Sequence, residues 1–246
     1  MGVASVSFPA YRGSDQNSSL VLPAPYLIYR GKFLKSDRRG VRGQLFDSER
    51  VDLSVSAALS PPAASDAILA RKGMPDLATN FEVGPQLDLT LWQNANRSRQ
   101  LHLLMPVRAA FTLGSQSESI GWVAHPKLNL DISNLAAMPG WNLGLQAGPL
   151  FGDQRQHAYF YDVDAAYATA SRPAYRASGG YAGMQMLMAL SKRYPSYWVG
   201  AFVRYDNLHG ASFADSPLVR TQQYFAAGIA VSWMLGESST RVMTSD

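Results

Sequence analysis

The sequence contains no cysteine in its 246 residues, so it can form neither a disulfide framework nor a metal site with thiolate ligands. Charged residues make up only 16% of the chain, whereas an average soluble domain has about 25%. No apolar run approaches the roughly 20 residues of a membrane helix, which excludes an α-helical membrane protein. The net charge of +4 is small and the basic residues are scattered, which excludes a clustered basic face for nucleic acid.

The first residues also lack a basic region followed by a long apolar core, so no signal peptide is visible. A chain of this length is expected to form a single domain over 1–246. Two segments stand apart from the pattern of the rest. They are a long connection at 61–78 and a C-terminal tail at 236–246.

Long segments alternate strictly between apolar and polar or small residues, which is typical of β-strands with two different faces. In the segment 224–235, one face carries Phe225, Ile229 and Trp233, and small residues dominate the other face. Polar turn clusters separate such segments. We predict about twelve strands, at 2–10, 20–30, 33–46, 51–60, 79–92, 100–113, 119–133, 140–151, 155–163, 178–191, 196–207 and 220–235.

Amphipathic strands of this kind fit either a soluble sandwich or barrel, or a membrane barrel. Many of the predicted strands span 11–15 residues, whereas soluble strands usually have about five or six. Aromatic residues near strand ends, such as Trp141, Phe151 and Trp233, are typical of interfacial girdles. Lipid offers no partner for an open strand edge. The sequence therefore predicts an all-β protein, a closed antiparallel transmembrane β-barrel of about 12 strands, in contact with outer-membrane lipid and lipopolysaccharide.

In such a barrel the apolar face meets lipid and the polar face lines the lumen. We expect Ile229 and Leu103 to face lipid, and Gln86 to face the lumen. The charged candidates for lining the lumen are Arg42, Glu82, Asp88, Arg108, Lys127, Asp131, Arg204 and Asp206. These residues could line a pore or fill it by pairing, so a porin-like channel for small solutes is an alternative function.

The sequence offers no catalytic constellation. None of the four histidines has the spacing of a metal site or a serine two residues after it, and Gly-x-Ser-x-Gly and P-loop motifs are absent. We predict no catalytic residue, no cofactor and no metal site. A lipid hydrolase built into the barrel wall is therefore disfavoured.

The connection 61–78 does not alternate, and we expect helical turns from Asp66 to Lys72, with Ser65 as N-cap and Gly73 as stop. With both termini taken as periplasmic, the strand count places 61–78 in the periplasm. The same count places four other segments outside the cell: 12–19, 93–99, 164–177 and 208–219.

Four stretches of the sequence, in order, resemble the MltA-interacting protein (MipA/OmpV) family of outer-membrane proteins. They are Pro9–Asp15, Leu22–Tyr26, Lys72–Leu77 followed by Glu82–Pro85, and Phe202–Leu208 with Ser216–Val219. The resemblance implies a non-enzymatic outer-membrane barrel of Gram-negative bacteria. It further implies a scaffold that links a murein-degrading lytic transglycosylase to a murein synthase, or alternatively a surface adhesin. The family supplies no catalytic residues to transfer to this chain.

A periplasmic scaffold must present its binding surface to the periplasm, which makes 61–78 the candidate partner-binding loop. Arg71, Lys72 and Asp76 are expected to supply exposed charge there. Met74 and Leu77 would offer a small apolar contact. In an alternative interpretation, Met74 and Leu77 only plug the lower mouth of the barrel.

Overall fold

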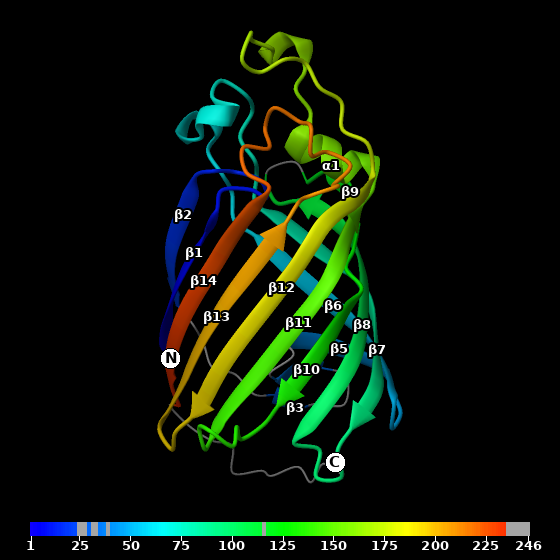
Figure 1. The fold of residues 1–246 in the computed structure, drawn as a ribbon, viewed down its shortest axis with the longest axis vertical. Helices are drawn as coiled ribbons and strands as arrows, with labels where there is room; N and C mark the ends of the chain where they lie inside the picture. Colours follow the sequence, from blue (N-terminus) through cyan, green and yellow to red (C-terminus); the bar gives the residue numbers. More distant parts are fainter. Residues whose placement is uncertain (24–28, 31–33, 38–39, 115–116, 235–246) are drawn as a thin grey trace.

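The computed structural model describes residues 1–23, 29–30, 34–37, 40–114 and 117–234. Its regular structure is almost entirely β-strand, as Figure 1 shows. Within these ranges, none of the helices has the length and apolarity needed to cross a membrane.

Fourteen strand segments form one antiparallel sheet. In chain order they are β1 (Gly2–Pro9), β2 (Asn17–Pro23), β3 (Tyr29–Arg30), β4 (Leu34–Asp37), β5 (Gly40–Asp47), β6 (Val51–Ser60), β7 (Asn80–Gln93), β8 (Arg99–Thr112), β9 (Ser119–Ala124), β10 (Lys127–Ile132), β11 (Trp141–Gly152), β12 (Gly180–Arg193), β13 (Tyr197–Asn207) and β14 (Gln223–Trp233). β9 and β10 are two parts of one crossing, because each pairs with both β8 and β11. Counting them together and leaving out the two-residue β3 gives twelve strands in the described chain, which confirms the predicted all-β antiparallel fold of about twelve strands.

The strand order is β2-β1-β14-β13-β12-β11-β10-β8-β7-β6-β5-β4-β3, with β9 beside β8 and β11. β1 lies beside β14, so that Gly2 is opposite Ser232. The two ends of this order, β2 and β3, follow one another in the chain, as the strands at the seam of a barrel do. In Figure 1 the sheet curls round, with β10 to β14 in front, β7 and β8 at the right and β5 and β6 behind.

Exposure alternates along the strands and separates an outward apolar face from an inward face. On β14, the outward side chains of Phe225, Ile229 and Trp233 are 63%, 66% and 51% exposed, while Tyr224 and Ala226 are buried. Because apolar side chains cover the outside, this is the face that a bilayer would solvate. The outward position of Ile229 agrees with the prediction.

The connections differ in length at the two ends of the barrel (Figure 1). One end, called the turn end below, carries the N-terminus and four short turns: 48–50, 94–98, 133–140 and 194–196. The other end, called the capped end, carries the segments 10–16, 61–79, 153–179 and 208–222, and the last three are longer than any of these turns.

The predicted strand over 155–163 is wrong, because this segment forms the helix α1 (Gln154–Tyr161). The Asp153 side chain accepts a hydrogen bond from the backbone N–H of Gln156 at 2.8 Å, as an N-cap does. His157 and Tyr161 are one helical turn apart and both are buried. The capped end also contains the 3₁₀ helices η1 (Ser65–Ala67), η2 (Leu69–Arg71) and η3 (Ala165–Tyr167).

The helical turns expected between Asp66 and Lys72 are present as η1 and η2. Ser65 is not their N-cap, since η1 begins after Ala64 and has no side-chain cap. The single strand predicted over 33–46 is wrong as well. Its described part forms two strands, β4 and β5, which pair with each other antiparallel.

The predicted side of 61–78 is also wrong. The Gln16 side chain donates to the Ala67 carbonyl (3.2 Å) and accepts from the Leu69 N–H (2.6 Å), and Arg172 donates to the Ala70 carbonyl (3.0 Å). The segment 61–78 therefore lies with 12–19 and 164–177 at the capped end.

The error in sidedness has a simple cause. The additional strand within 33–46 reverses the direction of every later crossing, and the helix in place of a strand at 155–163 restores it. The predicted strand count therefore places the segments between 47 and 153 at the opposite end from the one that the structure shows. For the same reason, 93–99 lies at the turn end rather than at the capped end.

Candidate functional site

A hydrophobic core fills the capped end and joins the four segments named above. At its centre, Tyr161 stacks on Phe213 with ring centroids 3.7 Å apart, and both side chains are at most 2% exposed. Further buried members of this core are Tyr11, Ile68, Leu77, Val163, Leu208 and Leu218. The four segments and this core are called the cap below. The cap packs over one end of the barrel, as the top of Figure 1 shows.

The first turn of the chain holds the cap together. The buried Tyr11 hydroxyl donates to the Leu218 carbonyl at 2.6 Å. Burial raises the pKa of Tyr11 to about 12, so its phenol stays protonated and keeps donating even near pH 10, where a free phenol ionises. The Gly13 carbonyl accepts from the N–H groups of Arg220 and Thr221 at 2.7 and 3.1 Å. Gly13 has φ +93°, which favours glycine at this position.

Arg12 anchors the cap to the barrel interior. Its Nε donates to the Tyr224 hydroxyl at 3.1 Å, and its Nη2 lies 3.4 Å from Oδ1 of Asp206. Asp206 is fully buried and also accepts from Arg204 at 2.7 Å and from Gln185 at 3.0 Å. A buried carboxylate is costly unless several donors satisfy it, and here three side chains share that role.

In the candidate partner-binding loop, Arg71 is built into the cap. It is only 3% exposed, and its guanidinium donates to Ser65 Oγ (3.1 Å) and to the carbonyls of Phe160 (3.0 Å) and Pro75 (3.1 Å). Leu77 is buried in the same core. Both side chains therefore support packing rather than a free surface.

The other residues of that loop are more accessible. Met74 is partly buried against the core, whereas Lys72 and Asp76 are exposed. Asp76 also accepts from the Ser65 N–H at 2.6 Å. Of the five residues proposed for partner binding, Lys72 and Asp76 thus offer the exposed charge.

Replacing Arg71 by alanine is expected to loosen the cap. The change removes three hydrogen bonds from a charged group, each worth about 1.5–3 kcal/mol. Trypsin should then cleave at Lys72 faster than in the wild-type protein. The matched control is an Arg155→Ala variant, whose side chain is exposed. Equal cleavage rates in both variants would contradict this role of Arg71.

The inward face of the sheet carries charged side chains that pair across strands. Arg108 Nε donates to Glu82 at 2.9 Å, and the two side chains are 14% and 15% exposed. Asp88 Oδ1 lies 2.8 Å from Nδ1 of His102, and both residues are buried. These pairs bridge β7 and β8 inside the barrel.

Other lumen candidates join the same kind of polar network. Lys127 and Asp131 lie on the inward face of β10, opposite Leu104 and Gln100 of β8. Asn129, between them, donates to Asp131 at 2.7 Å and accepts from Gln146 at 3.0 Å. The Arg42 side chain lies outside the described part of the structure. The remaining lumen candidates, Arg204 and Asp206, pair with each other as stated above.

His157 lies in the cap, in helix α1. The sequence pattern gives it no role, because it predicts a strand over 155–163. Its side chain is fully buried, and Nδ1 lies 2.8 Å from the Ser178 carbonyl, to which it donates. The ring packs edge-on against Phe213, with centroids 4.7 Å apart. Burial lowers the pKa of His157, and the Ser178 carbonyl and Asp153 oppose that shift.

The stability of the cap is expected to fall in mild acid. In the unfolded cap His157 has an ordinary pKa of about 6.5, and in the folded cap its pKa is lower. As the pH falls below about 6.5, the unfolded state binds more protons and is favoured. Hydrogen exchange in α1, corrected for its intrinsic pH dependence, should therefore accelerate between pH 7.5 and 5.

A His157→Gln variant should lose this pH dependence, because glutamine can still donate to Ser178 but does not titrate. A His209→Gln variant serves as the control, since His209 is exposed. It should respond to pH as the wild-type protein does. The same acceleration in all three proteins would refute the assignment to His157.

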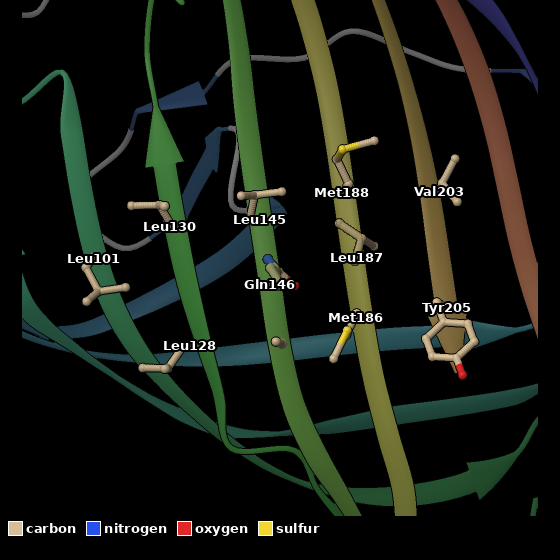
Figure 2. A pocket seen from close by; sticks show the side chains of 11 residues that line it. Leu101, Leu128, Leu130, Leu145, Gln146, Met186, Leu187, Met188, Val203 and Tyr205 are labelled. Carbon is tan, nitrogen blue, oxygen red and sulfur yellow. The ribbon is translucent and has the colours of Figure 1, made fainter. Parts of the chain in front are cut away.

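The outer wall carries an apolar groove of about 430 Å³, shown in Figure 2. Outward side chains such as Leu128, Met186, Met188 and Val203 line it, and Tyr205 lies at one end. This lining is that of a lipid-facing wall rather than of a reaction site. Within the described residues, no three His, Asp or Glu side chains are grouped so that they could hold a metal ion.

These observations define the class of the protein. It is an antiparallel barrel of the outer-membrane type, with an apolar outer wall, paired charges inside and a packed cap at one end. The family model described as MltA-interacting protein MipA matches residues 1–235, and the chain belongs to this family. No curated protein sequence matches the chain.

Three of the four stretches that carry the resemblance meet in the cap. Tyr11 of the first stretch donates to Leu218 of the fourth, and Leu77 of the third lies in the same core. Most of the second stretch, Leu22–Tyr26, lies outside the described residues. The stretches that carry the resemblance therefore include residues that build the cap.

Proposed function

We propose that this protein is a non-enzymatic outer-membrane scaffold that binds a lytic transglycosylase, and with it a murein synthase, on the periplasmic side. The family match over residues 1–235 carries this proposal. Two structural features support it. The cap fills one end of the barrel with packed side chains, and the inward charges are used in pairs rather than in a catalytic arrangement.

The lengths of the connections indicate the orientation. Outer-membrane barrels have short periplasmic turns and longer extracellular loops. On this basis the turn end faces the periplasm and the cap faces outside. A periplasmic partner would then meet the turn end, and the loop with Lys72 and Asp76 would be out of its reach.

Binding of purified MltA to the barrel in nanodiscs tests the proposal. We expect saturable binding by surface plasmon resonance, and co-capture of a murein synthase when MltA is present. Empty nanodiscs and nanodiscs with an unrelated barrel are the controls. Absence of binding above these controls would overturn the scaffold function.

An adhesin is the second candidate, favoured by the exposed Lys72 and Asp76 at the capped end. A channel is the third, favoured by the polar inward face of the sheet. Planar-bilayer recordings separate the channel from the scaffold. A scaffold with an intact cap should give little conductance, whereas steady unitary currents in the wild-type protein would favour the channel.

A further inference from the structure

The turn 133–140 has features that the fold of the barrel does not require. With eight residues it is the longest of the four turns at the turn end. Three consecutive apolar residues, Ala136, Ala137 and Met138, are exposed at its tip, and Met138 is 42% exposed. A short polar turn would connect β10 to β11 as well. An exposed apolar tip in this place is more typical of a contact surface.

The turn is held in one conformation. The Gly140 N–H donates to Asn134 Oδ1 at 2.7 Å, and the Met138 N–H donates to the Leu135 carbonyl at 3.0 Å. From the neighbouring hairpin, Lys192 Nζ donates to the Pro139 carbonyl at 3.1 Å. A fixed turn loses little conformational entropy on binding, which favours affinity.

The turn lies beyond the aromatic residues that mark the edge of the membrane. Lys192 Nζ lies 5.9 Å from the ring centroid of Trp141 and 5.2 Å from that of Tyr194. Tyr194 in turn stacks on Tyr197, with centroids 4.5 Å apart. Aromatic residues of this kind sit at the interface of outer-membrane barrels, so the tip of the turn is placed on its aqueous side.

Exposed arginines lie on the adjoining turns. The 133–140 turn is joined to the 94–98 turn by the hydrogen bond from the Ser133 N–H to the Ser98 carbonyl, at 2.7 Å. Arg97 and Arg99 flank that carbonyl, and both are exposed. Neither has an ion pair among the residues that the structure describes.

The next turn adds a third arginine, Arg50, whose carbonyl accepts from the Thr90 N–H at 2.9 Å. Its side chain is exposed, as is that of its acidic neighbour Glu49. At the capped end, exposed acidic side chains (Asp15, Asp66, Asp153, Asp164 and Asp215) are mixed with exposed basic ones (Lys72, Arg155, Arg176 and Arg220). In the turns 48–50, 94–98 and 133–140, by contrast, Glu49 is the one exposed acidic side chain, so the surface beside the apolar tip is locally basic.

We propose that Met138 and the tip of the 133–140 turn, with Arg50, Arg97 and Arg99, form the docking surface for a periplasmic protein that has an apolar pocket rimmed by carboxylates. This assignment rests on the proposed scaffold function. Methionine adapts to irregular apolar pockets, and complementary charges around a contact accelerate association. An anionic lipid headgroup would contact only the arginines and would leave Met138 without a partner. An apolar tip on the aqueous side of the membrane interface fits a protein pocket instead.

The experiment compares variants at the two ends of the barrel. Met138→Asp and the double variant Arg97→Glu/Arg99→Glu alter the proposed surface. Leu69→Asp and Arg155→Glu introduce the same two residue types, singly, at exposed positions of the capped end. Heat-modifiable mobility on gels verifies that each variant folds, and binding of purified MltA is measured with nanodiscs of zwitterionic lipid.

The Met138→Asp variant should raise the Kd at least about tenfold. The double arginine variant should lower the association rate about tenfold and reduce its salt dependence. The two capped-end variants should bind as the wild-type protein does. A parallel measurement replaces MltA by vesicles containing phosphatidylglycerol.

Each outcome bears on a separate claim. If the wild-type protein binds MltA and the turn-end variants bind equally well, the docking surface is wrong and the scaffold function stands. If the turn-end variants change only the binding of anionic vesicles, the surface is a lipid contact and the docking assignment is overturned. If the wild-type protein does not bind MltA, the scaffold function itself fails and this assignment fails with it.

Discussion

An Ile229→Arg variant should fail to insert stably into bilayers, while Gln86→Arg should insert nearly as well as the wild-type protein. Ile229 lies near the middle of β14 and is 66% exposed on the outward face. An arginine facing lipid at the midplane costs about 2–4 kcal/mol. Gln86 lies on the inward face of β7, on the same side as Glu82 and Asp88, where a new guanidinium would meet carboxylates and water.

The measurement is the folded fraction after refolding into liposomes, read from heat-modifiable mobility over a urea series. The two substitutions add the same side chain to the same barrel, so only the face differs between them. Equal loss of the folded fraction in both variants would mean that the outward wall does not face lipid.

A Phe213→Ala variant should open the cap and leave the barrel folded. Phe213 is fully buried and stacks on Tyr161 in the middle of the cap. Truncating a buried phenylalanine costs about 3–5 kcal/mol of stability. The contacts that are lost hold the cap segments together, so the cap is destabilised and the pairing of the strands is not. Trypsin should then cleave quickly at Arg176 and Arg220, and planar bilayers should show larger currents than the wild-type protein gives.

The control for this variant is Phe225→Ala, the same truncation at a side chain that is 63% exposed on the outer wall. Lipid fills the space that this truncation leaves, so the cap should stay resistant to trypsin. If Phe213→Ala is as resistant and as poorly conducting as Phe225→Ala, the core around Tyr161 does not close the barrel.

The fold class was predictable because alternation is a local signal. In segments such as 224–235, each residue shows its face by its own polarity, and the strands are long enough to exceed those of soluble sheets. Over a short segment that contains both apolar and polar residues, the alternation pattern does not distinguish a strand from a helix. In 154–161, the helix depends on the Asp153 cap and on packing of His157 against Phe213, a residue far away in the sequence.

The candidate site was less predictable, because its partners are distant in sequence. Arg12 binds Asp206, and Arg71 donates to the carbonyl of Phe160. The sequence alone presents Arg71 as one member of a charged loop, and only the fold reveals that it is buried. The paired lumen charges were easier to place, since Glu82 and Arg108 lie on the polar faces of neighbouring strands.

The contact between β1 and β14 also sets the order in which the molecule can assemble. Gly2 pairs with Ser232, so one seam of the wall joins residues about as far apart in the chain as the sequence allows. Contacts of such separation form slowly, because a long loop must close before they are gained. The Tyr11 hydrogen bond to Leu218 likewise needs the last hairpin in place. Until the last strands pair, the folding barrel therefore lacks the contacts that hold the cap in place, and the capped end stays open. Closure of that end by the cap is expected to be the last step of folding.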